Sequence, residues 1–235
     1  MDENKVERWL IVETSGRSGQ VALANGPHLS ASRTLDAARR HARDLAPSVA
    51  DLLNKQGWRP RDLTGVIVSR GPGSYTGLRV GIMSAKAFAY ATDTALIAVD
   101  TFAAIASQAA PEVLLLDVIG DAQQDKAYLQ QFARRPGDPE MRAAAPLAIV
   151  DFPSWLNGRN AAAWVGGPGL HRFHARLPSV CHVLDSSHWD PTADALLRLG
   201  RARHAGGEVD DPYTLEPLYL RPSSAEEQWT RRHSP

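Results

Sequence analysis

The sequence predicts an α/β protein in which helices cover a mixed β-sheet. One observation is a short apolar strand, 66–68, that passes through a glycine-rich loop into a helical segment, 78–92. Another is a series of short strands at the N-terminus, whose close spacing implies antiparallel pairing. Strands followed by helices in this order are typical of a mixed sheet with helices packed on it.

The first strands are expected at 10–13 and 20–24, joined by the polar turn 14–19. Residues 29–34 have the composition of a third strand that pairs with them. The N-terminal part of the sheet is therefore predicted to be antiparallel.

The first helix is expected to begin at Asp36, a favourable capping residue, and to end near Gly57. Apolar or small residues recur along it with a helical period. Pro47 interrupts the pattern, because proline removes one backbone donor and clashes with the preceding turn. The helix is expected either to kink at Pro47 or to restart with Pro47 in its first turn.

A strand at 96–99 and a helix at 101–109 complete the predicted first domain. A boundary is expected at 111–112, where a hairpin of strands 113–118 and 127–133 begins a smaller unit. That unit is expected to continue with two short strands and a helix capped by Asp190, at 147–150, 163–165 and 191–204. The predicted domains are 1–110, 111–222 and a flexible tail at 223–235.

The glycine-rich loop differs from both familiar phosphate-binding loops. A Walker A loop ends in Gly-Lys-Ser/Thr, whereas this loop ends in Gly77, Leu78 and Arg79 and lacks the phosphate-reaching lysine. The Rossmann spacing also fails, because one residue too many separates Gly71 and Gly73 from Gly77.

A row of small residues follows the loop along one side of the helix: Gly77, Gly81, Ala85 and Ala89. Residues four apart lie on the same helical face. Each helix-interior glycine costs about 1 kcal/mol relative to alanine, so the row implies that a second backbone comes very close. That backbone belongs either to the chain's own sheet or to another subunit.

The composition is that of an ordinary globular protein. Of the 235 residues, 43% are hydrophobic, and 26 basic residues balance 26 acidic ones, so no bulk charge favours nucleic acid or anionic lipid. The single cysteine, Cys181, excludes an internal disulfide and a cysteine-rich metal site. There is no apolar run approaching the roughly 20 residues of a membrane span, and residues 1–8 lack a signal peptide's apolar core. We therefore expect a cytoplasmic protein without a membrane partner.

Two clusters of polar residues are candidate chemical sites. Glu13, Thr14 and Ser15 in the opening turn have groups suited to magnesium and phosphate, and the same residues form ordinary polar turns. Asp117 and Asp121 could act as a catalytic pair, but acidic residues near a turn more often cap or solvate it.

The sequence gives little support for a metal site or a hydrolytic active site. His171 and His174 could share a helix face, but no third ligand accompanies them. The sequence has no Gly-x-Ser-x-Gly elbow, and Cys181 has no recognisable base. We therefore expect no catalytic residue, no cofactor and no metal ligand in this chain.

The segment 71–81, Gly-Pro-Gly-Ser-Tyr-Thr-Gly-Leu-Arg-Val-Gly, resembles the signature of the bacterial TsaB (YeaZ) family. Further segments resemble the family in order and spacing: 10–15 with 20–23, 41–47, 121–122 with Tyr128, and 217–221. The match is strong through about residue 106 and patchy beyond it. Glu13 stands where aspartate is more usual, and Gln123 and Lys126 replace the usual arginine and glutamate of the second-domain hairpin.

The resemblance implies the actin-like ATPase/hexokinase (ASKHA) superfamily fold with an abbreviated second lobe. It also implies a non-catalytic, activating partner subunit in threonylcarbamoyl transfer to an adenosine of tRNA. In the family, TsaD carries the transfer chemistry on threonylcarbamoyl-adenylate and TsaE contributes ATPase activity. TsaB pairs with TsaD or, when alone, with itself, and a partner is expected to hold most of the tRNA.

The interface implied by the resemblance lies on two helices. Its predicted residues are His41, Leu45 and Val49 on the first helix, and Gly77, Arg79, Gly81, Ala85 and Ala89 on the second. Arg79 and Arg70 have guanidinium groups suited to hydrogen bonds at the rim, or to a solvated surface.

The competing interpretation is an independent actin-like ATP-dependent phosphotransferase or a glycoprotease-like peptidase. A nucleotide titration separates the phosphotransferase from the partner subunit, because the enzyme requires binding by the isolated chain in the usual micromolar-to-millimolar range.

Overall fold

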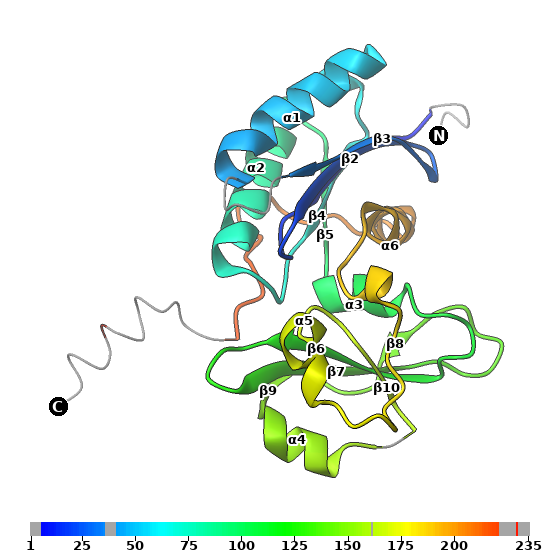
Figure 1. Cartoon of the computed structure of the whole chain (residues 1–235). Coiled ribbons are helices and arrows are strands. Elements are labelled where there is room, and N and C mark those ends of the chain that lie inside the picture. Colours follow the sequence, from blue (N-terminus) through cyan, green and yellow to red (C-terminus); the bar gives the residue numbers. More distant parts are fainter. Residues whose placement is uncertain (1–5, 36–40, 161, 221–228, 230–235) are drawn as a thin grey trace.

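The computed structural model describes residues 6–35, 41–160, 162–220 and 229, and the side chains of residues 41 and 42 lie outside that description. The chain forms two lobes, each organised by a five-stranded sheet (Figure 1). This arrangement confirms the predicted α/β class with a mixed sheet.

The first lobe begins with an antiparallel meander and continues with parallel strands. The sheet order is β3-β2-β1-β4-β5, in which β1 pairs antiparallel with β2 and parallel with β4. Its elements are β1 (Arg8–Glu13), β2 (Gly19–Asn25), β3 (His28–Leu35), α1 (His41–Gln56), η1 (Pro60–Asp62), β4 (Gly65–Ser69), α2 (Tyr75–Thr92), β5 (Ala95–Val99) and α3 (Thr101–Ala106).

Alternation along β1 explains how helices cover both faces of this sheet. Leu10 and Val12 belong to a core shared with α1 and α2, whereas Trp9 and Ile11 belong to a core shared with α6 (Ala193–Ala205). Successive strand side chains point to opposite faces, so one apolar run supplies both cores. Figure 1 shows α1 and α2 on one side of the sheet and α6 on the other.

The second lobe contains the predicted hairpin and a smaller sheet, ordered β10-β6-β7-β8, with β9 also paired to β7. Its elements are β6 (Leu115–Asp121), β7 (Lys126–Ala133), β8 (Arg142–Ala143), β9 (Ala148–Asp151), α4 (Phe152–Gly158), β10 (Trp164–Gly166), α5 (Leu170–Phe173), η2 (His174–Arg176) and η3 (Ser186–His188). Phe102 and Ile105 of α3 pack in one core with Leu116 of β6 and so join the two lobes.

Two helices differ from the sequence prediction in detail. α1 continues through Pro47 as one helix and ends before Gly57, whose φ of +65° suits a glycine. The predicted cap Asp36 lies outside the described residues. α3 ends at Ala106, three residues earlier than predicted.

The C-terminal helix belongs to the first lobe, which corrects the predicted domain division. Thr192, rather than Asp190, caps α6 by accepting a hydrogen bond from the amide of Ala195. The segment after α6 stays on the first lobe, since Asp210 N donates to Leu96 O at 2.8 Å and Leu218 N donates to Arg70 O at 2.8 Å. We call residues 208–220 the C-terminal strap.

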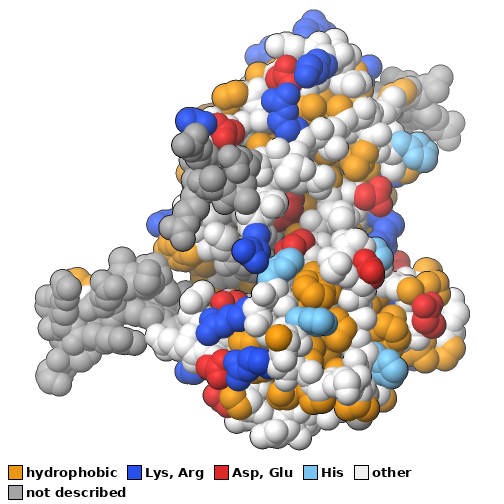
Figure 2. All heavy atoms as spheres, in the orientation of Figure 1, with side chains coloured by type: hydrophobic (Ala, Val, Ile, Leu, Met, Phe, Trp, Pro, Cys, Tyr) orange, Lys and Arg blue, Asp and Glu red, His pale blue; other side chains and the backbone are white. Residues whose placement is uncertain are grey.

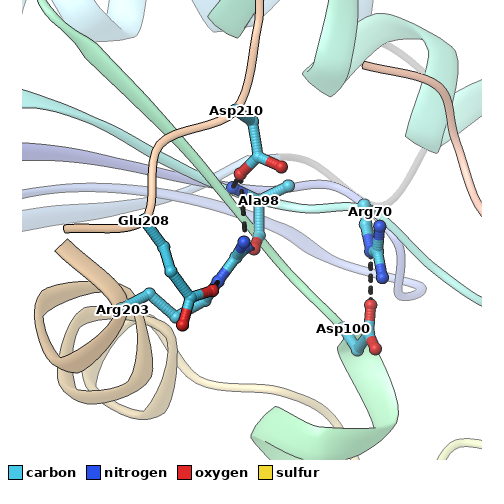
Figure 3. Close-up of polar contacts among 6 residues, drawn as sticks. All are labelled: Arg70, Ala98, Asp100, Arg203, Glu208 and Asp210. Atoms are coloured by element: carbon cyan, nitrogen blue, oxygen red, sulfur yellow. Dashed lines mark hydrogen bonds and ion pairs between the residues drawn. The ribbon is translucent and has the colours of Figure 1, made fainter. Parts of the chain in front are cut away.

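Side chains from α6 and the strap close the free edge of β5 (Figure 3). The Asp210 carboxylate accepts a hydrogen bond from Ala98 N at 2.7 Å, and Arg203 donates to Ala98 O. Arg203 also pairs with Asp210 and with Glu208. Asp210 and Arg203 therefore supply to Ala98 the acceptor and the donor that a neighbouring strand would provide. None of the helices in the described ranges is long and apolar enough to span a membrane.

Candidate functional site

The glycine-rich loop joins β4 to α2 and packs on the turn between β1 and β2. Ser74 caps α2 by accepting a hydrogen bond from Gly77 N at 3.2 Å, and its own amide donates to Ser15 O at 2.8 Å. A Cβ added at Gly73 would lie 2.5 Å from Ser15 O. The loop therefore needs a glycine here because another backbone touches it.

The same explanation holds for the row of small residues on α2. A Cβ at Gly77 would come closer than 3.0 Å to Thr14 O, and one at Gly81 equally close to Thr14 Oγ1. The Thr14 hydroxyl donates to Gly77 O at 2.8 Å. Ala85 and Ala89 continue the row into the core under α1 and α2. The second backbone is thus the chain's own β1 and its turn, and the expectation that these four residues meet another subunit is corrected.

The remaining residues of the predicted interface differ in how deeply they are buried. Leu45 and Val49 of α1 are buried in the core, where they pack with the sheet rather than face outward. His41 begins α1, but its side chain lies outside the described part of the chain. Arg79 is exposed and lies 5.1 Å over the Tyr75 ring. Contact between a partner and the helices α1 and α2 stays a prediction. Such a contact requires a face of these helices other than the buried faces that the sequence predicted.

The opening turn directs its polar groups inward. Oε1 of Glu13 accepts from Ser15 N and Ser15 Oγ, both at 2.5 Å, and from Gly16 N at 3.2 Å. Burial raises the pKa of Glu13, while hydrogen bonds from Ser15, Ser69 and Gly16 act in the opposite direction. The hydroxyls of Thr14 and Ser15 are likewise engaged within the chain, so the turn's main use here is structural.

The two acidic residues of the second-domain hairpin do not form a catalytic pair. Asp117 is buried and accepts from Gln131 Nε2 at 2.8 Å, and burial raises its pKa. Asp121 instead caps the hairpin turn and forms an ion pair with Arg172 at 2.9 Å. Each carboxyl group therefore has its own structural partner.

His171 and His174 contact one tryptophan, and the cysteine has a different neighbour. His171 Nε2 lies 2.7 Å from Asp190 Oδ2, and the rings of His171 and His174 both pack against Trp189. Arg159 donates to Cys181 Sγ at 3.2 Å. Within the described ranges, no three His, Cys, Asp or Glu side chains converge to hold a metal ion.

The sequence analysis missed the outward side of α2. Tyr75, Arg79, Met83, Lys86 and Tyr90, here called the α2 outer face, lie on the side away from the small residues. Met83 and Tyr90 are 62% and 67% exposed. Large apolar side chains at helical spacing opposite the small residues were the signal that could have revealed it.

A groove of about 630 Å³ runs between the α2 outer face and the strap, where Leu215 and Leu220 contribute apolar lining. Aromatic rings join its two sides, because Tyr75 stacks on Tyr219 at 4.6 Å and Tyr90 packs edge-on against Tyr213 at 5.7 Å. Lys86 donates to Leu215 O at 2.9 Å and fixes the strap to the helix. This amphipathic groove is the candidate functional surface.

Comparisons of this chain with known proteins agree on one family. The family model described as "TsaD: tRNA N6-adenosine threonylcarbamoyltransferase" matches residues 35–157. The tRNA threonylcarbamoyladenosine biosynthesis protein TsaB of Bacillus subtilis is 27% identical, over 94% of this chain and 96% of its own length. TsaB of Escherichia coli strain K12 is 26% identical, over 91% of this chain and 94% of its own length.

A solved structure supports the same grouping. YeaZ from Pseudomonas aeruginosa superposes with a TM-score of 0.77 and 28% identity, covering 91% of this chain and 100% of that chain. The fold is accordingly that of YeaZ, with a mixed sheet in its first lobe. The chain belongs to the tRNA N6-adenosine threonylcarbamoyltransferase (TsaD) family and, within it, to the TsaB/YeaZ proteins.

Proposed function

We propose that this chain acts in tRNA threonylcarbamoyladenosine biosynthesis as the non-catalytic partner of a TsaD-type transferase. The observation that carries the proposal is its likeness to a TsaB protein over nearly the whole length of both chains. The transferase name of the matching family model points to a related catalytic subunit as the partner.

The surroundings of the polar side chains favour an accessory subunit rather than an enzyme. The polar groups of the opening turn and of the β6–β7 hairpin are hydrogen bonded within the chain. A general base or nucleophile must instead be within reach of a substrate atom. We therefore assign the transfer chemistry to the partner.

The α2 outer face and its groove are the surface we propose for that partner. Aromatic residues, methionine and arginine are enriched at protein interfaces, and this surface combines all three. The same face would serve a homodimer when the chain is alone, and a TsaE-type ATPase would be reached through the complex. Arg79 is the one residue of the sequence-predicted interface that this proposal retains.

Direct capture of tRNA by this chain is not part of the proposal. Basic and acidic residues balance at 26 each, and Figure 2 shows them interspersed on the face that it draws. Phosphate neutralisation by clustered Lys and Arg drives nucleic-acid binding. The tRNA is accordingly assigned to the assembled complex, in the cytoplasm.

The test is reconstitution of the modification with TsaD and TsaE from the same source. Omitting this chain should abolish formation of threonylcarbamoyladenosine, measured by mass spectrometry of digested tRNA. Met83→Asp should weaken association with TsaD about tenfold or more, because it places a charge in a desolvated contact.

A matched control is Val180→Asp, since Val180 is 74% exposed but lies in the second lobe. It should leave association and modification unchanged. Normal modification without this chain would refute the proposed function. Equal association by Met83→Asp and the control would refute only the proposed surface.

A further inference from the structure

Arg79 is the exposed charged residue of α2, and two tyrosine rings hold it in place. Its Cζ atom lies 5.1 Å from the centre of the Tyr75 ring. That ring in turn stacks on Tyr219 of the strap, with the ring centres 4.6 Å apart and an interplanar angle of 23°. A cation–π contact acts through the charge of the guanidinium group and leaves its N–H donors available. Arg79 therefore presents hydrogen-bond donors from a position that the chain itself fixes.

No carboxylate of this chain neutralises Arg79 within the described ranges. The helix α2 contains no aspartate or glutamate, and Lys86 is its other charged residue. Glu216 of the strap lines the same groove, but none of the ion pairs among the described residues includes Arg79 or Glu216. Arg70, in contrast, is paired with Asp100 at 2.5 Å. Arg79 thus has no acidic partner in the described part of its own chain.

The neighbours of Arg79 on the helix determine what a partner must supply. Tyr75 lies four residues before it and Met83, which is 62% exposed, four residues after it, so all three lie on one face. A subunit that covers Met83 therefore also covers the guanidinium group. A charge removed from water is costly unless it is paired and hydrogen bonded. The partner consequently needs an anionic group opposite Arg79, a requirement that rests on the proposed function, in which the α2 outer face is covered.

The anionic group could be a carboxylate or a phosphate, since the planar fork of arginine matches both. Binding of a nucleic acid depends on several cations that neutralise successive phosphates. On this face Arg79 has one cationic neighbour, Lys86, whose Nζ already donates to Leu215 O at 2.9 Å. A largely apolar face with one exposed charge fits a protein surface with a carboxylate, and it does not fit a phosphate backbone.

We propose that Arg79 binds the carboxylate of an aspartate or glutamate on the TsaD-type partner through two parallel N–H···O hydrogen bonds. Tyr75 is a positioning residue, because its stack with Tyr219 reduces the freedom that the arginine loses on binding. The ion pair also selects the partner. The helix α2 of a second copy brings no carboxylate, so a contact between the α2 helices of two copies leaves Arg79 unmatched.

The test measures association of the full chain with TsaD from the same source by biolayer interferometry, at about 50 and about 300 mM NaCl. Arg79→Gln should weaken association about tenfold or more and reduce its dependence on salt, since salt screens an ion pair. Arg79→Lys keeps the charge without the fork and should lose less. The matched control is Arg135→Gln, at an exposed arginine of the second lobe, which should associate as the unaltered chain does. Thermal melting should be unchanged in all three variants, because both arginines are exposed.

The partner's carboxylate is located by replacing aspartates and glutamates of TsaD singly with asparagine and glutamine. The replacement that causes no further loss in Arg79→Gln identifies the pair. Association of Arg79→Gln equal to that of the control, with the same salt dependence, would overturn this inference, while a loss in Met83→Asp would leave the proposed surface intact. Normal association combined with weaker tRNA capture by the assembled complex would assign Arg79 to a phosphate instead. If the unaltered chain did not bind TsaD at all, the proposed function and this inference would fall together.

Discussion

Gly81 of α2 lies against the side chain of Thr14, so closely that a Cβ at position 81 would fall within 3.0 Å of Thr14 Oγ1. The hydroxyl of Thr14 in turn donates to Gly77 O at 2.8 Å. The helix and the end of β1 are therefore joined by a contact that only glycine permits. This contact gives the small-residue row a role in folding rather than in association.

Replacing Gly81 by leucine should destabilise the fold. Overpacking of this kind costs about 1 to 3 kcal/mol or more of unfolding free energy, because the neighbouring backbone must move. Chemical denaturation monitored by circular dichroism measures the loss. Ala87→Leu, on an exposed position of the same helix, should change stability little. A stable Gly81→Leu protein that fails only to associate with TsaD would contradict this assignment.

Replacing Glu13 by glutamine should change how stability depends on pH. Burial raises the pKa of Glu13 above 4.5, so the folded state retains a proton that the unfolded state releases. The free energy of unfolding should fall as pH rises from about 4.5 toward the raised pKa, and Glu13→Gln should remove that part of the slope. Urea titrations at several pH values measure this slope, and parallel profiles for the two proteins would be evidence against a raised pKa.

Removing the carboxylate of Asp210 should loosen the edge of β5. Asp210→Ala leaves Ala98 N without its acceptor and Arg203 without one of its partners. The expected loss is about 1 to 3 kcal/mol, the cost of an unsatisfied buried donor. Glu208→Ala removes the more exposed partner of Arg203 and should cost less than about 1 kcal/mol. Equal losses in the two variants would mean that the Ala98 contact is unimportant.

Magnesium-ATP should bind the isolated chain weakly or not at all. The glycine-rich loop lacks a phosphate-reaching lysine, and the hydroxyl groups of Thr14 and Ser15 are hydrogen bonded within the chain. Isothermal titration calorimetry is the measurement. Micromolar affinity that disappears in Glu13→Ala would support the competing phosphotransferase interpretation.

Binding of tRNA by the isolated chain should likewise be poor. The balanced charge offers little counterion release, which is the main source of sequence-independent affinity. Filter binding at two salt concentrations tests this expectation. Tight capture that weakens steeply with salt would instead place a basic tRNA site on this chain.

The local elements of the fold could be predicted from the sequence. Short runs joined by a polar turn located β1 and β2, residues 29–34 had the composition of β3, and the glycine-rich loop located the junction of β4 with α2. The antiparallel hairpin of β6 and β7 followed from two apolar runs with a polar turn between them. These features depend on neighbouring residues, so composition and periodicity were sufficient.

The long-range packing was decided only by the tertiary structure. A row of small residues shows that a backbone comes close, but it does not say whose, and here that backbone is Thr14, more than sixty residues before Gly77. The helical pattern of α6 gave no sign that it returns to the first sheet across the whole second lobe. The groove likewise arises because the strap near Leu215 lies along α2. Sequence pattern determined where the elements form, and the burial of apolar faces against distant partners determined which surfaces stay exposed for function.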